Sequence, residues 1–236
     1  MKITVINGSM RHGSTWNLKE TVLQALAQKT ETSVQEFDLP EALPHFCNGC
    51  FSCFLHGEQT CPHAAFVQPI VEALLASDLI ILLSPVYGLD VSGQMKACLD
   101  HLCYLWMSHR PQAAMFHKLG LVISTSAGIG MVRTAKTMRL SLKYWGVPKT
   151  FTMAQSVAAM RWEEIAAPKR AKLEQKAQKT ARAILRAANR GDRLRKPIQR
   201  SLMFRMMAGA QKKNDWNPTD RNHWESQGWL SGKRPF

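Results

Sequence analysis

Four cysteines crowd into one short stretch of the sequence, at a spacing suited to metal binding. Cys47, Cys50 and Cys53 recur at every third residue, and Cys61, which Pro62 follows, completes the set. Three closely spaced thiolates with a more distant Cys-Pro are typical of iron–sulfur sites, and zinc uses the same ligands. The pattern therefore predicts an iron–sulfur cluster held by Cys47, Cys50, Cys53 and Cys61, with zinc, or thiols that carry no metal, as the alternatives.

Two histidines and two further cysteines lie close to this set in the sequence. His56 and His63 are near enough to be zinc ligands, although a histidine in a loop is more often solvated. Cys98 and Cys103 are five residues apart on an expected helix, so they do not share a face of it. We expect Cys98 and Cys103 to be core thiols.

A second chemical feature is the turn at residues 8–17, GSMRHGSTWN, which joins a β-branched run to a helical stretch. Backbone N–H groups at a helix N-terminus attract anions, and Arg11 adds positive charge. The spacings of the triphosphate loop and of the dinucleotide loop are both absent. The turn therefore predicts a monophosphate site, with an ordinary turn that carries Ser and Thr caps as the alternative.

Two more loops follow expected strands and suit a flat ligand. Residues 84–88, SPVYG, combine a proline-stiffened turn with an aromatic side chain, and residues 125–130, TSAGIG, let the backbone approach a ligand closely. Each loop is a weak signal alone. Because ligands of parallel α/β sheets bind at the carboxyl ends of strands, the three loops together predict one binding site.

The elements that must position these loops alternate between strand and helix five times. The middle strands are apolar throughout, as strands covered on both faces must be, so the pattern predicts a doubly wound parallel sheet. The expected strands are residues 2–7, 32–38, 78–84, 118–125 and 149–154. The expected helices are residues 15–29, a helix that begins near Pro69, and residues 93–107, 131–144 and 165–190.

The chain divides into a domain and an extension. Residues 1–190 carry the alternating pattern and include a cysteine-rich loop at residues 38–63, which is long enough to need an organising partner. Residues 191–236 lack the pattern and form a basic extension that contains Trp216, Trp224 and Trp229. We expect these tryptophans to pack on the domain or across a subunit boundary. A membrane-surface helix at residues 198–210 is the alternative.

The combined motifs GSMRHGSTWN, the cysteine loop, SPVYGLDVSGQMKACLDH and TSAGIGMV resemble the flavodoxin-like NAD(P)H-dependent FMN reductases. Within that family the chain is similar to the iron–sulfur flavoproteins. The resemblance covers about residues 1–190 and implies a flavodoxin-like sheet of strand order 2-1-3-4-5 that holds FMN. It implies that the FMN phosphate is held by Ser9, Arg11, Ser14, Thr15 and Asn17. It implies that the isoalloxazine ring is lined by Pro85, Val86, Tyr87 and Gly88, and that its other edge is closed by Thr125, Ser126, Ala127 and Gly128.

The resemblance also implies the activity. Electrons would pass from NAD(P)H through FMN to a small-molecule or protein acceptor, with the flavin rather than a catalytic side chain doing the chemistry. The alternative within the family is a relay in which a [4Fe–4S] cluster on the four cysteines receives electrons from ferredoxin. Proteins of this resemblance are oligomers, so a homodimer or homotetramer is expected.

The charge of the chain is concentrated near its end. The formal net charge is +14, and residues 160–236 hold 19 Lys and Arg against seven Asp and Glu. A solvated helix face explains most of this charge, and docking of an acidic redox partner is the functional interpretation. A protein that binds nucleic acid or anionic membrane through this basic segment is the alternative from another class. No apolar run is long enough to span a bilayer and no secretory signal is visible, so we expect a cytoplasmic protein.

Overall fold

The computed structural model describes residues 1–191 and 198–236, and it places five parallel strands in one sheet. The strand order is β2-β1-β3-β4-β5, so the predicted flavodoxin-like sheet of order 2-1-3-4-5 is confirmed. The central strand β3 is buried along its whole length, as its unbroken apolar sequence predicts. The strands are β1 (Lys2–Asn7), β2 (Ser33–Asp38), β3 (Leu79–Leu83), β4 (Leu119–Ser126) and β5 (Lys149–Ser156).

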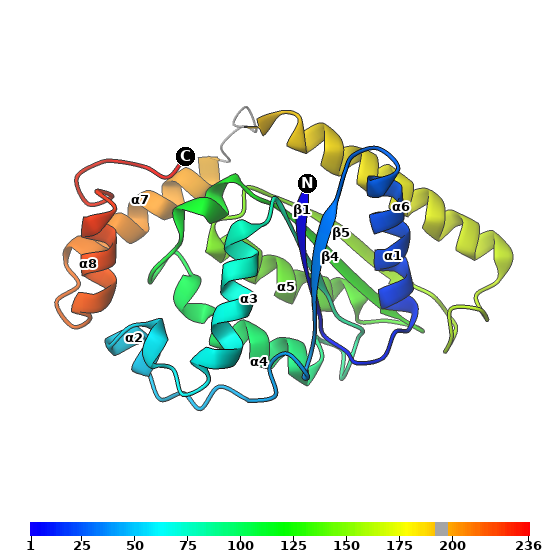
Figure 1. The fold of residues 1–236 in the computed structure, drawn as a ribbon, viewed down its shortest axis with the longest axis horizontal. Helices are drawn as coiled ribbons and strands as arrows, with labels where there is room; N and C mark the ends of the chain where they lie inside the picture. Colours follow the sequence, from blue (N-terminus) through cyan, green and yellow to red (C-terminus); the bar gives the residue numbers. More distant parts are fainter. Residues whose placement is uncertain (192–197) are drawn as a thin grey trace.

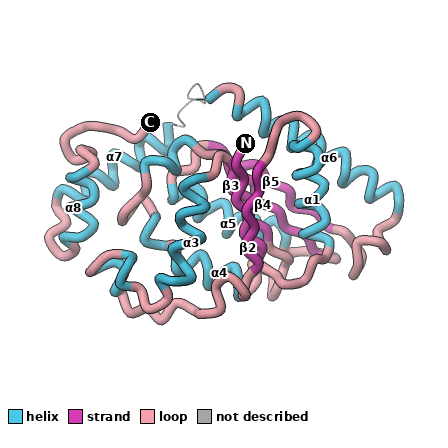
Figure 2. Tube along the Cα trace, in the orientation of Figure 1, coloured by secondary structure: helices cyan, strands magenta, loops and turns pink. Residues whose placement is uncertain are grey.

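Helices cover both faces of the sheet, which Figure 2 shows between two helical layers. On one face, α1 and α6 pack against each other, and on the other face lie α3, α4 and α5 (Figure 1). Alternate strand residues therefore point into two separate cores, with Ile6 and Leu82 in one and Val5 and Ile81 in the other. The helices are α1 (Ser14–Ala27), α3 (Ala64–Ala76), α4 (Gly93–His101), α5 (Met131–Trp145) and α6 (Ala167–Ala188).

Two helices differ from their predicted bounds. The helix expected to begin near Pro69 begins at Ala64, so Pro69 lies inside it. Proline lacks an N–H and removes one helical hydrogen bond, but the buried side chains of Val67 and Ile70 hold the helix on the sheet. The helix expected at residues 93–107 ends at His101, because the chain turns there to bury the following residues in the core.

The cysteine loop, residues 38–63, carries only short helical turns between β2 and α3. They are α2 (Ser52–Leu55) and η1 (Glu58–Thr60), and none of their residues is buried. The chain enters α2 through Phe51, whose φ of 59° lies in the left-handed region that bulky residues avoid. A segment of this kind has too little core of its own and depends on neighbouring elements for its shape.

The C-terminal extension packs against the domain. Its described part, from residue 198, contains α7 (Ile198–Lys212) and α8 (Pro218–Ser226), which lie beyond α3 and α2 at one end of the molecule (Figure 1). Phe204, Trp224 and Trp229 are buried and form an aromatic cluster with Phe116 of the domain. The predicted boundary at residue 190 is followed by residues 192–197, which lie outside the described part of the chain.

Not every aromatic residue of the extension is covered. Trp216, which we expected to be packed like the other two tryptophans, is 73% exposed because it precedes α8 in a loop. Leu202 and Met206 on α7 are exposed too, although Phe204 between them is buried. Within residues 1–191 and 198–236, no helix combines the length and the apolar character that crossing a membrane requires.

Candidate functional site

Three loops at the carboxyl ends of β1, β3 and β4 surround one cavity of about 210 Å³. Ten of the thirteen residues predicted to bind FMN line this cavity, and a role in FMN binding stays a prediction for each of them. Asn17, Gly88 and Gly128 do not line it. The ten residues are Ser9, Arg11, Ser14, Thr15, Pro85, Val86, Tyr87, Thr125, Ser126 and Ala127.

The first loop wraps the N-terminus of α1. The hydroxyl of Ser9 accepts a hydrogen bond from the backbone N–H of Arg11 at 3.1 Å. The side chain of Asn17 donates to the carbonyl of Gly13 at 3.1 Å, so it fixes the loop from behind instead of facing the cavity. The first turn of α1 contains no acidic residue and no side chain caps it, which leaves its N–H groups and its positive dipole end for an anion.

Glycine is required where the first loop leaves β1. A Cβ on Gly8 would lie 2.9 Å from the hydroxyl oxygen of Ser92 and 3.1 Å from the carbonyl oxygen of Leu83. The hydroxyl of Ser92 donates to the carbonyl of Gly8 at 2.5 Å, and the backbone N–H of Gly8 donates to the carbonyl of Leu83 at 2.7 Å. The start of the first loop is therefore fixed to the end of β3 and to the N-cap of α4.

The third loop is tied to the first across the sheet. The hydroxyls of Thr15 and Thr125 are 2.6 Å apart and buried. The hydroxyl oxygen of Ser126, which lines the same cavity, is buried and has no hydrogen-bond partner in the described structure. A buried polar atom without a partner costs free energy, so Ser126 points to a ligand that supplies its missing hydrogen bond.

The second loop forms the more open wall of the cavity. The backbone N–H of Val86 donates to the carbonyl of Thr125 at 3.2 Å, and Tyr87 pairs with Asp90 to close a tight turn. Gly88 adopts a φ of 56°, which this turn requires, so its role is to shape the loop. Tyr87 is 48% exposed, which leaves its ring available to a flat ligand.

Sequence reasoning missed a fourth wall. Val157, Ala159 and Met160, in the loop between β5 and α6, also line the cavity. The guanidinium of Arg11 donates to the carbonyl of Met160 at 2.5 Å and joins this loop to the first loop. The residues of this loop form no motif. The one signal in the sequence that it could line the cavity was its position after the fifth expected strand.

The four predicted metal ligands line a second cavity, of about 340 Å³. Cys47, Cys50, Cys53 and Cys61 come from the cysteine loop, and the opposite wall comes from the C-terminal end of α4 and the turn that follows it. None of the four forms a disulfide. Four thiols around one cavity fit either an iron–sulfur cluster or a zinc ion.

Cys103 corrects one sequence prediction. Cys98 is a buried core thiol as expected, but Cys103 lines the cysteine cavity, because α4 ends before it and the chain turns toward the loop. Burial, followed by the proximity of the thiols Cys53 and Cys47, raises the pKa of the Cys103 thiol to about 12. Burial, followed by the proximity of Cys61, raises the pKa of the Cys53 thiol to about 11, while the Arg110 guanidinium lowers it.

Two imidazoles lie beside the thiols. Nδ1 of His63 is 3.0 Å from Nε2 of His101, and Nδ1 of His101 is 2.8 Å from the carbonyl oxygen of Ala97. The ligand atoms of Cys61, His63 and His101 all lie within 4.8 Å of one another, a set that could hold a metal ion. His56, the other histidine considered as a ligand, does not line the cavity.

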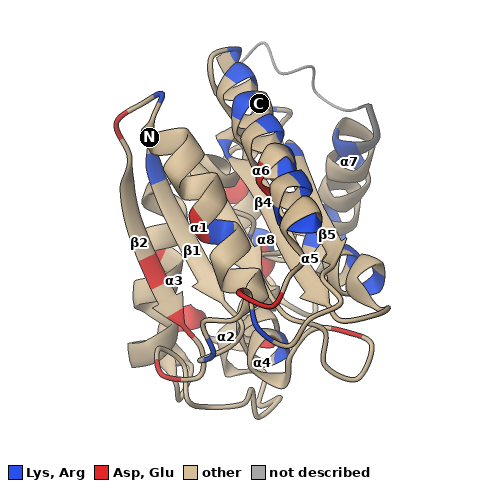
Figure 3. Cartoon of the chain, turned by 90° about the vertical axis from the view of Figure 1, so that its right-hand side faces the viewer, with Lys and Arg blue, Asp and Glu red and all other residues tan. Residues whose placement is uncertain are grey.

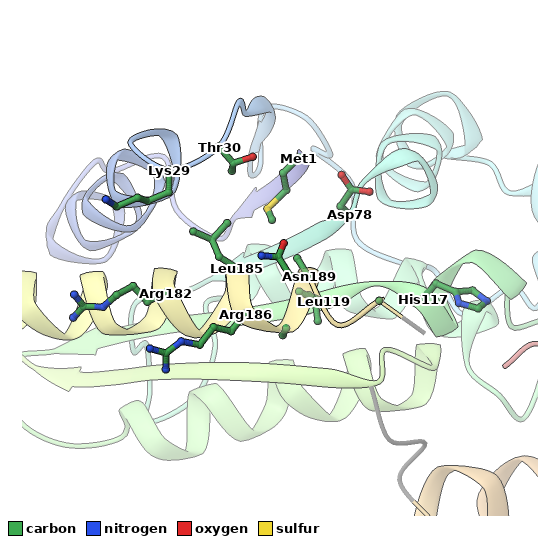
Figure 4. Close-up of a pocket in the computed structure, with 13 residues that line it drawn as sticks. Met1, Lys29, Thr30, Asp78, His117, Leu119, Arg182, Leu185, Arg186 and Asn189 are labelled. Atoms are coloured by element: carbon green, nitrogen blue, oxygen red, sulfur yellow. The ribbon is translucent and has the colours of Figure 1, made fainter. Parts of the chain in front are cut away.

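A larger cavity, of about 640 Å³, lies at the opposite, amino end of the strands (Figure 4). Met1 and Asp78, which directly precede β1 and β3, line it together with Leu119 of β4, and Arg182 and Arg186 line it from α6. Among the described residues that line it there is no cysteine and none of the residues predicted to bind FMN or a metal. The predicted cofactor and metal ligands lie around the two smaller cavities instead.

Comparison with known proteins agrees with this geometry. Residues 1–163 match the family model described as NADPH-dependent FMN reductase. The chain belongs to this FMN reductase family. The matched residues contain all three loops of the first cavity and the whole cysteine loop. The C-terminal extension lies outside the match.

Individual relatives within the family differ in their named activities. The chain is 32% identical over 149 residues to an iron–sulfur flavoprotein of Archaeoglobus fulgidus, covering 62% of this chain and 64% of that protein. It is 33% identical over 102 residues to an iron–sulfur flavoprotein of Clostridioides difficile, covering 42% of this chain and 45% of that protein. It is 25% identical to an FMN-dependent NADH:quinone oxidoreductase of Herminiimonas arsenicoxydans, covering 61% of this chain and 77% of that protein. The match thus spans less than two thirds of the length of either iron–sulfur relative.

Solved structures of other proteins share the fold. An azoreductase from Bacillus anthracis has a TM-score of 0.60 at 14% identity, covering 77% of this chain and 98% of that one. An FMN-dependent NADH-azoreductase from the same species, in complex with FMN, has a TM-score of 0.57 at 13% identity and covers 77% of this chain and 100% of that one. At these identities the likeness shows the flavodoxin-like fold alone.

Proposed function

We propose that this FMN reductase family member is an oxidoreductase that takes electrons from NAD(P)H on bound FMN and passes them to a second substrate. The observation that carries the proposal is the cavity at three strand ends, with an uncapped helix N-terminus, Arg11 and the orphaned hydroxyl of Ser126 around it. The family match supports the same cofactor. The acceptor that we propose is a small molecule or a small acidic electron-carrier protein.

The protein's part in this chemistry is to bind and orient the cofactor. FMN, when bound, would supply the acceptance of a hydride from a reduced nicotinamide and the release of electrons, chemistry that no amino-acid side chain supplies. Ser9, Arg11 and Thr15 lie where a phosphate would meet the N-terminus of α1. Val86 and Tyr87 form the wall suited to a flat ring, and the exposure of Tyr87 leaves one side of the cavity open for a second substrate.

Selectivity for the phosphate tests this assignment directly. We expect flavin-stripped protein to bind FMN about 100-fold more tightly than riboflavin, because only FMN presents a charged phosphate to the uncapped helix end and Arg11. The measurement is quenching of flavin fluorescence during titration. Equal affinity for the two flavins would place the ligand elsewhere and remove the basis of the proposal.

The cysteine cavity supports a second candidate function, an electron relay through an iron–sulfur cluster. Cys47, Cys50, Cys53 and Cys61 are the residues that would hold a [4Fe–4S] cluster, which transfers one electron at a time. One helix connects the two cavities: the N-cap of α4 bonds to the first loop at Gly8, and its last residue, His101, lines the cysteine cavity. The nine residues of α4 span about 13 Å, which separates the end of the helix near the first cavity from the end that lines the cysteine cavity.

Analysis of iron and sulfide distinguishes the two candidates. Protein purified without oxygen should contain about four iron atoms and four labile sulfides per chain if the cubane cluster is present. Cys50→Ser should lose iron and sulfide, whereas Cys98→Ala, a change in the core outside the cavity, should retain them. Wild-type protein without iron would exclude the relay and leave the nucleotide-driven reductase.

A further inference from the structure

The C-terminal extension reaches the back of the cysteine loop through one buried carboxylate. Asp220, near the start of α8, is fully buried. Its backbone N–H donates to the side-chain oxygen of Asn217 at 3.1 Å, and its carboxylate accepts from the side-chain nitrogen of Asn217 at 3.0 Å. These two bonds fix the carboxylate in the first turn of α8, so the orientation of Asp220 is set within α8 itself.

Arg110 connects this carboxylate to the cysteine loop. Its guanidinium is buried and donates to Oδ1 of Asp220 at 2.5 Å. The other terminal nitrogen of the same guanidinium donates to the carbonyl of Cys53 and lies 3.3 Å from a carboxylate oxygen of Glu58. One planar side chain therefore joins α8 to the residue that carries a predicted cluster ligand and to the turn that follows it.

Other contacts run between the same elements. The hydroxyl of Thr219 donates to the carbonyl of Leu55 at 2.6 Å. Nδ1 of His109 is 2.7 Å from Oδ2 of Asp220, and the ring of Phe54 packs against the ring of His109 with centroids 4.4 Å apart. The extension thus contacts the backbone of α2 directly, and through His109 of the domain it is linked to the side chain of Phe54.

The cysteine loop needs such support. No residue of α2 is buried, and Phe51 enters it in a left-handed conformation. Ser52 and Thr60 hydrogen-bond to each other, which shapes the loop internally but does not attach it to the domain. A strained segment without a core keeps one conformation only where its surroundings fix it.

We propose that Arg110 and Asp220 are positioning residues that hold Cys53, and with it the cysteine loop, in the conformation that binds the cluster. This inference rests on the proposed cluster site. Asp220 lies outside residues 1–163, which match the family model, whereas the cysteine loop lies within them. Loss of the buried carboxylate leaves the guanidinium with the partly exposed Glu58 as its anionic partner, so Arg110 is held less firmly against the Cys53 carbonyl and the loop loosens.

The test compares two Asp→Asn changes in the same extension. Asp220→Asn removes the buried carboxylate, whereas Asp215→Asn removes an 86% exposed one that pairs with Arg221. Partners that orient metal ligands change metal affinity by about 10- to 100-fold when they are removed. We therefore expect the Asp220→Asn protein to lose iron to a chelator at least about tenfold faster than wild type and the Asp215→Asn protein at the wild-type rate.

A second readout does not depend on a cluster. In metal-free protein we expect alkylation of Cys53, followed by mass spectrometry, to be about tenfold faster after Asp220→Asn, with Cys98 in the core unchanged. Wild-type protein without iron would count against the cluster site but not against the role of Asp220. The alkylation comparison would still decide whether Asp220 holds the cysteine loop in place. Equal Cys53 rates in the Asp220→Asn and Asp215→Asn proteins would overturn that role.

A milder variant covers the case in which Asp220→Asn does not fold. Arg110→Lys keeps a positive charge for Asp220 but replaces the planar fork with one ammonium, which cannot span the carboxylate and the Cys53 carbonyl as Arg110 does. We expect this protein to retain FMN, a sign of an intact domain, and to show a smaller rise in the Cys53 alkylation rate. Retained FMN with unchanged Cys53 reactivity would contradict the proposal.

Discussion

Arg11 places a positive charge at the edge of the proposed FMN site. It lines the cavity beside the N-terminus of α1, and its guanidinium also holds the Met160 carbonyl. We expect Arg11→Gln to weaken FMN binding by about 10- to 100-fold, because a hydrogen bond to a charged group contributes about 1.5–3 kcal/mol. Flavin fluorescence titration measures the effect, with Lys172→Gln on the exposed face of α6 as the control. An unchanged dissociation constant would exclude Arg11 from the phosphate site.

Gly8 makes a steric rather than a chemical contribution. A Cβ there meets Ser92 and Leu83, whereas a Cβ on Gly93, nearby on α4, meets nothing within 4 Å. We expect Gly8→Ala to lower the free energy of unfolding by about 1–3 kcal/mol and to reduce FMN content. Gly93→Ala, at the first residue of α4, should lower neither, as denaturant titration and flavin analysis would show. Wild-type stability of the Gly8→Ala protein would mean that the loop is looser than the structure indicates.

Some residues of the candidate sites could be predicted from the sequence, and others could not. Ser9, Arg11 and Thr15 could be found because one turn between a strand and a helix contains them all. Asp220 could not be matched to Arg110, because 110 residues separate them and neither belongs to a motif. Cys103 was misassigned because its role depends on where α4 ends, and helix ends follow from the packing of the next residues.

Among the elements, α8 is the one whose attachment should respond to pH. Nε2 of His223 lies 2.8 Å from the carbonyl oxygen of Pro111. Burial lowers the pKa of His223 below its ordinary 6.5, with Arg110 lowering it and the Pro111 carbonyl, Glu58 and Asp220 opposing the shift. Below about pH 6.5 the unfolded chain therefore binds more protons than the folded one, and stability falls as the pH decreases.

His223→Gln isolates this effect, because glutamine keeps an N–H donor that does not titrate. We expect wild-type protein to lose more stability than the His223→Gln protein between about pH 7.5 and about pH 5.5, and the two to run parallel above that range. Denaturant midpoints across the pH range provide the measurement. Identical pH profiles would mean that His223 does not govern the attachment of α8.

The sheet and its crossover helices could be predicted because their pattern is local. The buried run of β3 and the alternation of strands and helices predicted a doubly wound parallel sheet, and the family resemblance implied its strand order. The docking of α7 and α8 could not be predicted in the same way. The apolar side chains of Trp224 and Trp229 indicated that the extension packs on another surface. Nothing in the sequence identified Phe116 as part of that surface.

Across the whole molecule, positive charge gathers on the outer face of α6 (Figure 3). Lys172, Lys179 and Arg182 are exposed there, and they make no ion pair within the described residues. Such a face accelerates encounter with an acidic protein and is screened by salt. It is the surface that we propose for an acidic electron-carrier partner.

Charge reversal tests that surface. We expect Lys172→Glu with Lys179→Glu to slow electron transfer to an acidic carrier by about tenfold at low salt, with the difference vanishing at high salt. The rate at which NADPH reduces the flavin should not change, because α6 does not line the FMN cavity. Stopped-flow absorbance separates the two steps. Equal transfer rates at low salt would remove α6 from the docking surface.

Anaerobic titration of the purified protein with NADPH, followed by its visible spectrum, tests the central claim most directly. We predict one bound FMN per chain and loss of its visible absorbance with about one NADPH per flavin, since a hydride carries two electrons. NADH in a parallel titration establishes the nucleotide preference. A protein that binds no FMN, or whose FMN keeps its colour in millimolar excess of both nucleotides, would contradict the assignment.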